Sequence, residues 1–165
     1  AKALILDSKW PFKAWNYPKC FYEFGFADPD VEYVGFWDNP HVACENPDPN
    51  IRTSMYLKPD GRAVVIISNL GDAPKKTNVR LAAKAMGLDP AQTMVQDGEA
   101  CELSKKVKRG TRDWVYRTWR GGVAIMPDGD ESLRPIATKT EGDSIDVELL
   151  VPARDYRLLD IKPKS

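Results

Sequence analysis

The sequence predicts an all-β protein, an antiparallel β-sandwich of about eight strands with Greek-key-like connections. Its 13 prolines and 11 glycines fall mostly between short apolar runs, a distribution that suits strands and turns better than long helices. Several runs alternate apolar and polar residues, which is the pattern of a strand with one buried face. Residues 63–67 are apolar on both faces and need cover on both sides, so we expect a second layer.

The beginning of the chain differs from this pattern. In residues 1–25, aromatic residues such as Trp10, Phe12 and Trp15 stand between prolines, which predicts an irregular segment or a linker from a preceding domain. We therefore expect the sandwich domain to span residues 26–165. The full length of 165 residues suits one domain, which can bury roughly 70% of the surface that its unfolded chain exposes.

The first half of the domain contains the clearest strand signals. Residues 31–37 form a candidate strand. In 51–58, apolar and polar residues alternate, which predicts a half-buried strand with Tyr56 on the wetter face. The turn residues Pro59, Asp60 and Gly61 follow, and β-branched residues come directly after them, so 58–72 reads as a hairpin that leads into the central strand 63–67.

The second half predicts further strands. Residues 78–83, 93–103, 112–119 and 145–151 are the candidates, and the run 148–161 is expected to supply a closing strand. The spacing of apolar residues within 78–88 leaves a short helix open for the second half of that run, with Gly87 as its end.

Composition excludes several classes of protein. Lys plus Arg and Asp plus Glu are balanced at 24 each, so nothing at the level of the whole chain indicates nucleic acid. No run approaches the roughly 20 apolar residues that a membrane-spanning helix needs, so we expect no membrane span. Cys20, Cys44 and Cys101 form no CxxC pair; we expect mainly free thiols, with one disulfide left open.

Motifs of catalysis and metal binding are also missing from the sequence. His41 is the single histidine, which excludes a multi-histidine metal site. The GxSxG, GxxxxGK, HExxH and GxGxxG motifs are absent, and a glycosidase pair cannot be selected among so many acids. We expect no enzyme activity from this domain. The acid-rich turns 28–30, 45–50 and 128–131 offer oxygen ligands for Ca²⁺, but none has EF-hand spacing, and turns without a cofactor are the favoured interpretation.

The best candidate for a binding surface lies in residues 105–120, which contain 7 Lys or Arg residues and the single acid Asp113. If this part is extended, a strip of basic and aromatic side chains alternates along it. Aromatic rings accept the apolar face of a sugar, and guanidinium groups bind hydroxyls or an anionic substituent. The predicted ligand-binding residues are Arg112, Trp114, Tyr116, Trp119 and Arg120. Cross-strand packing and a solvated basic surface are the alternatives.

A second aromatic set consists of Trp10, Phe12, Trp15 and Tyr17 in the N-terminal segment, together with Trp37. In isolation these rings would leave an exposed apolar patch. We interpret the set mainly as an interface with another domain or as part of the core.

Several stretches resemble the C-terminal antiparallel β-sandwich of glycoside hydrolases similar to family 123 and to the α-galactosidase clan. The resemblance runs from 24–26 through 36–39 and continues with 51–56, 62–72, 86–89 and 151–160, so it extends over about 120 residues and has no catalytic signature. In that family the catalytic residues lie in a preceding (β/α)₈ barrel, so none is carried over to this chain.

The resemblance implies a non-catalytic accessory domain of a carbohydrate-active enzyme. Such a domain is expected to be extracellular or periplasmic, to bind a polysaccharide or oligosaccharide, including acidic ones, and to contact a preceding catalytic domain. The alternative is a purely structural or interaction domain that packs against a catalytic barrel or a partner chain.

Overall fold

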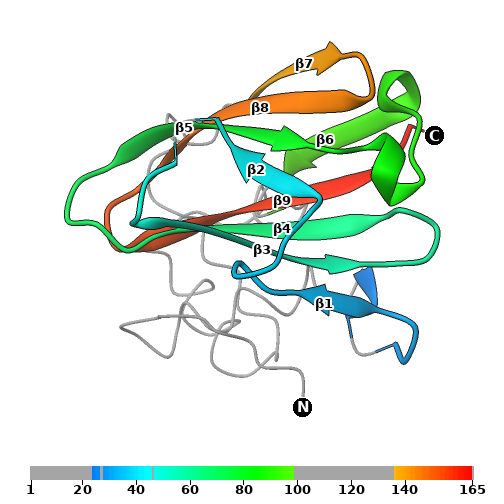
Figure 1. The fold of residues 1–165 in the computed structure, drawn as a ribbon, viewed down its shortest axis with the longest axis horizontal. Coiled ribbons are helices and arrows are strands. Elements are labelled where there is room, and N and C mark those ends of the chain that lie inside the picture. The colour runs from blue at the N-terminus through cyan, green and yellow to red at the C-terminus, as the bar shows by residue number, and fades with distance from the viewer. Residues whose placement is uncertain (1–23, 27, 46, 99–135, 165) are drawn as a thin grey trace, which may run out of the picture.

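The computed structural model describes residues 24–26, 28–45, 47–98 and 136–164 and confirms the β-sandwich (Figure 1). A five-stranded sheet has the order β1-β3-β4-β9-β6, and a four-stranded sheet has the order β2-β5-β8-β7. All pairs of neighbouring strands are antiparallel. The strands are β1 (Glu32–Val34), β2 (Val42–Cys44), β3 (Ile51–Leu57), β4 (Ala63–Asn69), β5 (Lys75–Leu81), β6 (Thr93–Asp97), β7 (Ala137–Glu141), β8 (Ser144–Val151) and β9 (Asp155–Pro163).

The predicted hairpin joins β3 and β4 at the middle of the five-stranded sheet. Leu57 pairs with Ala63, and the Lys58 N–H donates to the Arg62 carbonyl at 2.9 Å. Gly61 adopts a φ of 84°, the left-handed conformation that favours glycine, and a Cβ there would lie 2.6 Å from the Met86 carbonyl oxygen. The turn therefore requires glycine for its backbone conformation and for its close packing.

The main core lies between the two sheets. Met55 from β3, Val65 and Ile67 from β4, and Val79 and Val147 from the opposite sheet are fully buried in it. The central position of β4, with β3 on one side and β9 on the other, explains why both of its faces are apolar, as the sequence predicted.

A second, smaller core covers the outer face of the five-stranded sheet. There Val64, Ile66 and Leu158 are buried together with Phe24 and Val31 from the segment before β1. Tyr56, expected on a wetter face, lies in this core with only 1% of its surface exposed. That expectation was wrong because the segment before β1 folds back over the sheet, and burial raises the pKa of Tyr56 to about 12.

Other sequence-based predictions need correction. The run 148–161 was expected as one closing strand, but it contains the end of β8, a turn at Pro152–Arg154 and most of β9, which belong to different sheets. The first candidate strand is shorter than 31–37. The helix left open in 78–88 is a three-residue 3₁₀ turn (Lys84–Met86) that ends at Gly87, after the strand β5. A second 3₁₀ turn, Pro90–Gln92, precedes β6.

No helix in the described part of the chain is long and apolar enough to cross a membrane. The expected irregular segment is covered by the structure only from Phe24 onward, so most of it lies outside the described residues, and so does the candidate strand 112–119.

Candidate functional site

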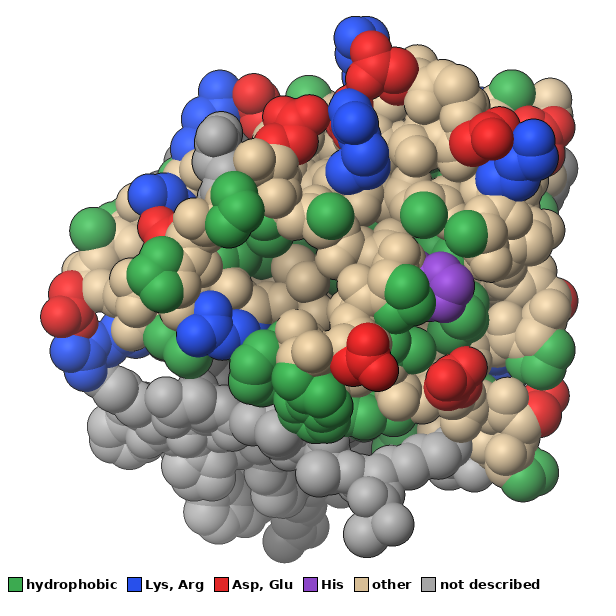
Figure 2. Space-filling view, viewed as in Figure 1, with side chains coloured by type: hydrophobic (Ala, Val, Ile, Leu, Met, Phe, Trp, Pro, Cys, Tyr) green, Lys and Arg blue, Asp and Glu red, His purple; other side chains and the backbone are tan. Residues whose placement is uncertain are grey.

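A groove with a volume of about 190 Å³ lies at one end of the outer face of the five-stranded sheet. We call it the aromatic groove. Hydrophobic side chains gather in the lower part of the face shown in Figure 2, over β1 and the connection that follows it. The groove is lined by Tyr33, Phe36, Arg52, Ser54, Ser68, Asn69, Leu70, Arg154, Asp155 and Tyr156.

The floor of the groove follows from strand register. Arg52 on β3 pairs with Ser68 on β4, and Ser68 pairs with Tyr156 on β9, so these three side chains form one row across the sheet. Ser54 lies two residues further along β3 on the same face. The two serines are short and stand between larger side chains, which leaves a hollow. Neither serine hydroxyl makes a hydrogen bond among the described residues, so both can bind a ligand.

The rings of Tyr33 and Phe36 line one side of the groove, and Trp37 packs against both of them just outside its lining. The ring of Trp37 meets that of Phe36 edge to face with centroids 5.2 Å apart, and it meets that of Tyr33 at 6.3 Å. Both side chains are exposed, Trp37 by 65% and Phe36 by 44%. The ring of Tyr33 also packs on the buried ring of Tyr56, with the centroids 5.1 Å apart, and this contact holds the aromatic side of the groove on the sheet.

Arg52 lies beside this aromatic side of the groove. Its guanidinium carbon stands 5.3 Å from the centroid of the Phe36 ring, and one Nη1 donates to the Ile51 carbonyl at 3.0 Å. The ring and the carbonyl hold the guanidinium in place and leave most of its donors unused. Arg52 is also the one arginine of the described residues without a carboxylate partner. The others pair as Arg62–Asp60, Arg80–Asp146, Arg154–Asp72 and Arg157–Asp97.

The opposite wall is held by Asn69. Its buried side-chain amide donates to the carbonyls of Ala73, Val151 and Pro152, and its oxygen accepts from the Gly71 N–H at 2.9 Å. The residue thereby fixes the β4–β5 turn against the β8–β9 turn.

The β8–β9 turn itself is tightly constrained. Arg154 has a φ of 50°, its N–H donates to the Gly71 carbonyl at 3.0 Å, and its side chain contacts Asp72. This wall is therefore preformed rather than assembled on binding.

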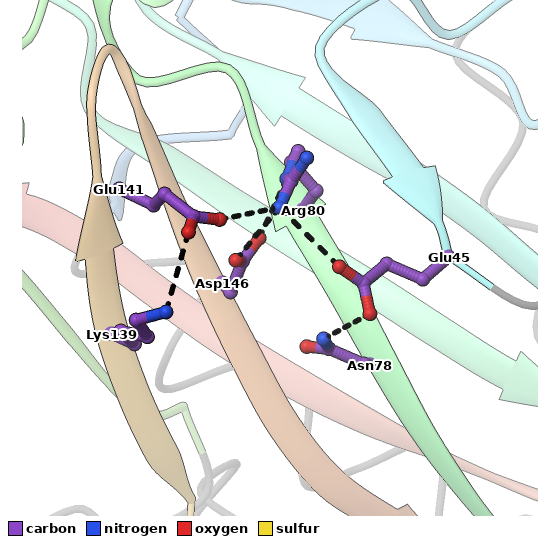
Figure 3. Close-up of polar contacts among 6 residues, drawn as sticks. All are labelled: Glu45, Asn78, Arg80, Lys139, Glu141 and Asp146. Atoms are coloured by element: carbon purple, nitrogen blue, oxygen red, sulfur yellow. Dashed lines mark hydrogen bonds and ion pairs between the residues drawn. The ribbon is translucent and has the colours of Figure 1, made fainter.

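The outer face of the four-stranded sheet has a different character (Figure 3). Arg80 on β5 donates to both oxygens of Asp146 on β8, at 2.7 and 2.9 Å, and also reaches Glu141 and Glu45. These contacts, chiefly the hydrogen bond to Asp146, raise the pKa of Arg80. The same hydrogen bond lowers the pKa of Asp146. Because every charge here has a partner among its neighbours, we interpret this cluster as structural.

Two carboxylates of the acid-rich turns have partners within the protein. Asp28 pairs with Lys58 at 2.9 Å, and Asp48 pairs with Lys75 at 2.8 Å and accepts from the Asn50 N–H. Among the described residues, no group of three or more His, Cys, Asp or Glu side chains is placed to hold a metal ion. The turn 128–131 lies outside them. His41 Nδ1 is buried without a hydrogen-bond partner among the described residues, and His41 belongs to no such group.

The residues predicted from the sequence as the binding strip, namely Arg112, Trp114, Tyr116, Trp119 and Arg120, lie outside the described residues, so that prediction stays untested. The same holds for the N-terminal aromatics, whereas Trp37 is described and is exposed. The sequence analysis did not select Arg52, Phe36 or the two serines. The adjacent pair Phe36-Trp37 after a short strand was the available signal, but its proximity to Arg52 depends on the pairing of β1 with β3.

In comparisons with known proteins, no family model matched the chain, and no curated protein or solved structure was significantly similar to it.

Proposed function

We propose that this domain is a non-catalytic accessory β-sandwich of a carbohydrate-active enzyme and that it binds a saccharide in the aromatic groove. The observation that carries the proposal is the exposed Trp37–Phe36 pair beside a hollow lined with hydroxyl and guanidinium groups. The resemblance noted in the sequence points to the same class of protein.

The chemistry of the groove suits a sugar. A pyranose ring has an apolar face of C–H groups that packs against an indole or phenyl ring, and the exposed faces of Trp37 and Phe36 offer such a surface. The hydroxyls of Ser54 and Ser68 can exchange hydrogen bonds with sugar hydroxyls. The groove is smaller than the roughly 300–1,000 Å³ of a pocket for a drug-sized ligand, so it would hold a single sugar unit and leave the rest of a chain on the open surface.

The same residues favour binding over hydrolysis. Glycoside hydrolysis generally uses two carboxylates on opposite sides of the bond, whereas the groove contains one carboxylate, Asp155, among its described lining residues. The proposed partners are a polysaccharide or oligosaccharide and a preceding catalytic domain, in an extracellular or periplasmic setting. The strip around Trp114 remains a second candidate surface for the same ligand.

Affinity gel electrophoresis against a panel of neutral and acidic polysaccharides tests the proposal. We expect at least one polymer to retard the protein, and we expect Trp37→Ala to abolish most of the retardation because the stacking surface is lost. Lys76→Ala is the control, since Lys76 lies on the outer side of the other sheet, where it pairs with Glu148. Unchanged mobility of the wild-type protein on every polymer would contradict saccharide binding, and equal retardation of Trp37→Ala would contradict this site.

A second candidate function, docking against a neighbouring domain or partner chain, is favoured by the exposed aromatic pair itself. An indole that is 65% exposed and packed on Phe36 is a typical interface anchor. Light scattering tests this candidate. A docking domain should self-associate or form a complex with a preceding domain that is added to it, and Trp37→Ala should weaken that association. A monomer that binds sugar but no protein would exclude this candidate.

A further inference from the structure

The arginines of the described residues fall into two groups, and the difference concerns the ligand of the groove. Four of them hold a carboxylate of the protein itself, while Arg52 holds none. A guanidinium matches a carboxylate with two parallel hydrogen bonds, and an arginine without one keeps this capacity.

The position of Arg52 prepares it for such a contact. The Phe36 ring at 5.3 Å and the Ile51 carbonyl at 3.0 Å restrain the guanidinium, so less side-chain freedom is lost when a ligand binds. It lines the groove next to Ser68, its partner across the β3–β4 ladder, so an anionic group there would also meet a hydroxyl. Partial burial strengthens the interaction relative to one on a fully exposed surface.

We propose that the aromatic groove binds an acidic sugar and that Arg52 recognises its carboxylate. This inference rests on the proposed saccharide-binding function and names the class of ligand. The ring of the sugar packs on the exposed Trp37, which adjoins the groove through Tyr33 and Phe36, and its carboxylate points toward Arg52 on β3.

The other charges of the groove set the orientation of the ligand. Asp155 lies on β9, two strands from Arg52, which corresponds to a distance of about 10 Å across the sheet. Asp155 accepts from the Tyr156 N–H at 2.9 Å and is the one carboxylate among the described lining residues. Arg154 at the same end already contacts Asp72, which offsets its charge. The carboxylate of the sugar is therefore expected at the Arg52 end and its neutral hydroxyls at the Asp155 end.

The test compares polymers that differ only in the carboxylate. The full 165-residue chain is run in affinity gels that contain polygalacturonate or hyaluronate, and in gels with the carboxyl-reduced form of each polymer. We expect at least one acidic polymer to bind about tenfold or more tightly than its reduced form, which corresponds to one charge-assisted hydrogen-bonded contact. The preference should decrease as salt is added.

Variants locate the effect. Arg52→Met keeps the apolar stem and removes the charge, and it should bring the acidic and reduced polymers to within about twofold of each other. Arg62→Met is the matched control, because it makes the same change in net charge at the β3–β4 turn, outside the groove, and it should keep the preference. Arg52→Lys keeps the charge without the planar fork and should give an intermediate preference, which also covers the case in which Arg52→Met does not fold.

The outcomes separate this inference from the function on which it rests. Equal binding of acidic and reduced polymers, with loss of both in Trp37→Ala, would overturn the role of Arg52 and leave saccharide binding in place. Full preference retained in Arg52→Met, or lost in Arg62→Met, would also overturn it. No binding to any polymer would remove both proposals.

Discussion

The outer faces of the two sheets use arginine in opposite ways. On the four-stranded sheet, Arg80 is surrounded by Asp146, Glu141 and Glu45, which satisfy its charge (Figure 3). On the five-stranded sheet, Arg52 lies over an aromatic ring at the edge of a groove and has no carboxylate partner among the described residues. Two arginines on similar sheet faces therefore differ in whether a carboxylate of the protein already pairs with the guanidinium. Only an arginine without such a partner keeps its donors available for a ligand.

The largest change in stability is expected from removing the Asn69 side chain, which holds one wall of the groove. Asn69→Ala deletes the side-chain amide, whose NH2 group is shared among three carbonyls and whose oxygen accepts from the Gly71 N–H, and so leaves these backbone groups without that partner. We expect a loss of about 3 kcal/mol in the free energy of unfolding, together with loss of ligand binding. Urea denaturation, monitored by tryptophan fluorescence, measures the loss in the free energy of unfolding. A loss below about 0.5 kcal/mol would show that Asn69 does not hold the wall.

The next effect concerns the four-stranded sheet and is a dependence on pH. The pKa of Asp146 is lower in the folded protein, so its contribution to stability is present above the ordinary pKa of an aspartate and is lost as the pH falls through the folded value. Asp146→Asn should therefore be less stable than the wild type at neutral pH, and the gap should close in acid.

Melting temperatures between pH 7 and pH 2, in roughly unit steps, would measure this gap. Asp143→Asn is the control, because Asp143 forms an ion pair with Lys84 in which both side chains are largely exposed. A gap that stays constant over the whole range would contradict the role of the Asp146 carboxylate.

The smallest effect on stability is expected from the groove side chains themselves. Arg52→Met and Trp37→Ala should each change the free energy of unfolding by less than about 0.5 kcal/mol, because one residue has no ion pair and the other is mostly exposed. Their effects should instead fall on binding: Trp37→Ala should weaken it for every polymer, and Arg52→Met should remove the preference for the acidic one. A loss of stability as large as that of Asn69→Ala would instead make these residues part of the fold and erase the contrast.

Sequence patterns predicted the sandwich because local signals specify much of it. Residues 63–67 are apolar on both faces, which favours a central strand, and they fall within β4. Pro59 and Gly61 favour the tight turn that precedes it. Two exceptions have a common cause. Tyr56 is buried by a segment distant in sequence, and the turn at Arg154 moves the chain from one sheet to the other without a glycine. Such long-range packing has no local signature.

The candidate site was harder to predict for the same reason. Arg52 and Ser68 become neighbours only through the β3–β4 ladder, and Phe36 reaches Arg52 only because β1 pairs with β3. The strip around Trp114 was conspicuous because its residues are contiguous, but contiguity in sequence is a weak guide to a site that several strands build together.

The position of β9 has a consequence for how the protein is made. This strand, Asp155–Pro163, lies inside the five-stranded sheet between β4 and β6, although it follows all the other described strands in the sequence (Figure 1). The nascent polypeptide therefore leaves the backbone N–H and C=O groups on the facing edges of β4 and β6 unpaired until residues 155–163 have emerged from the ribosome. During that interval the half-built sheet is open to pairing with other chains.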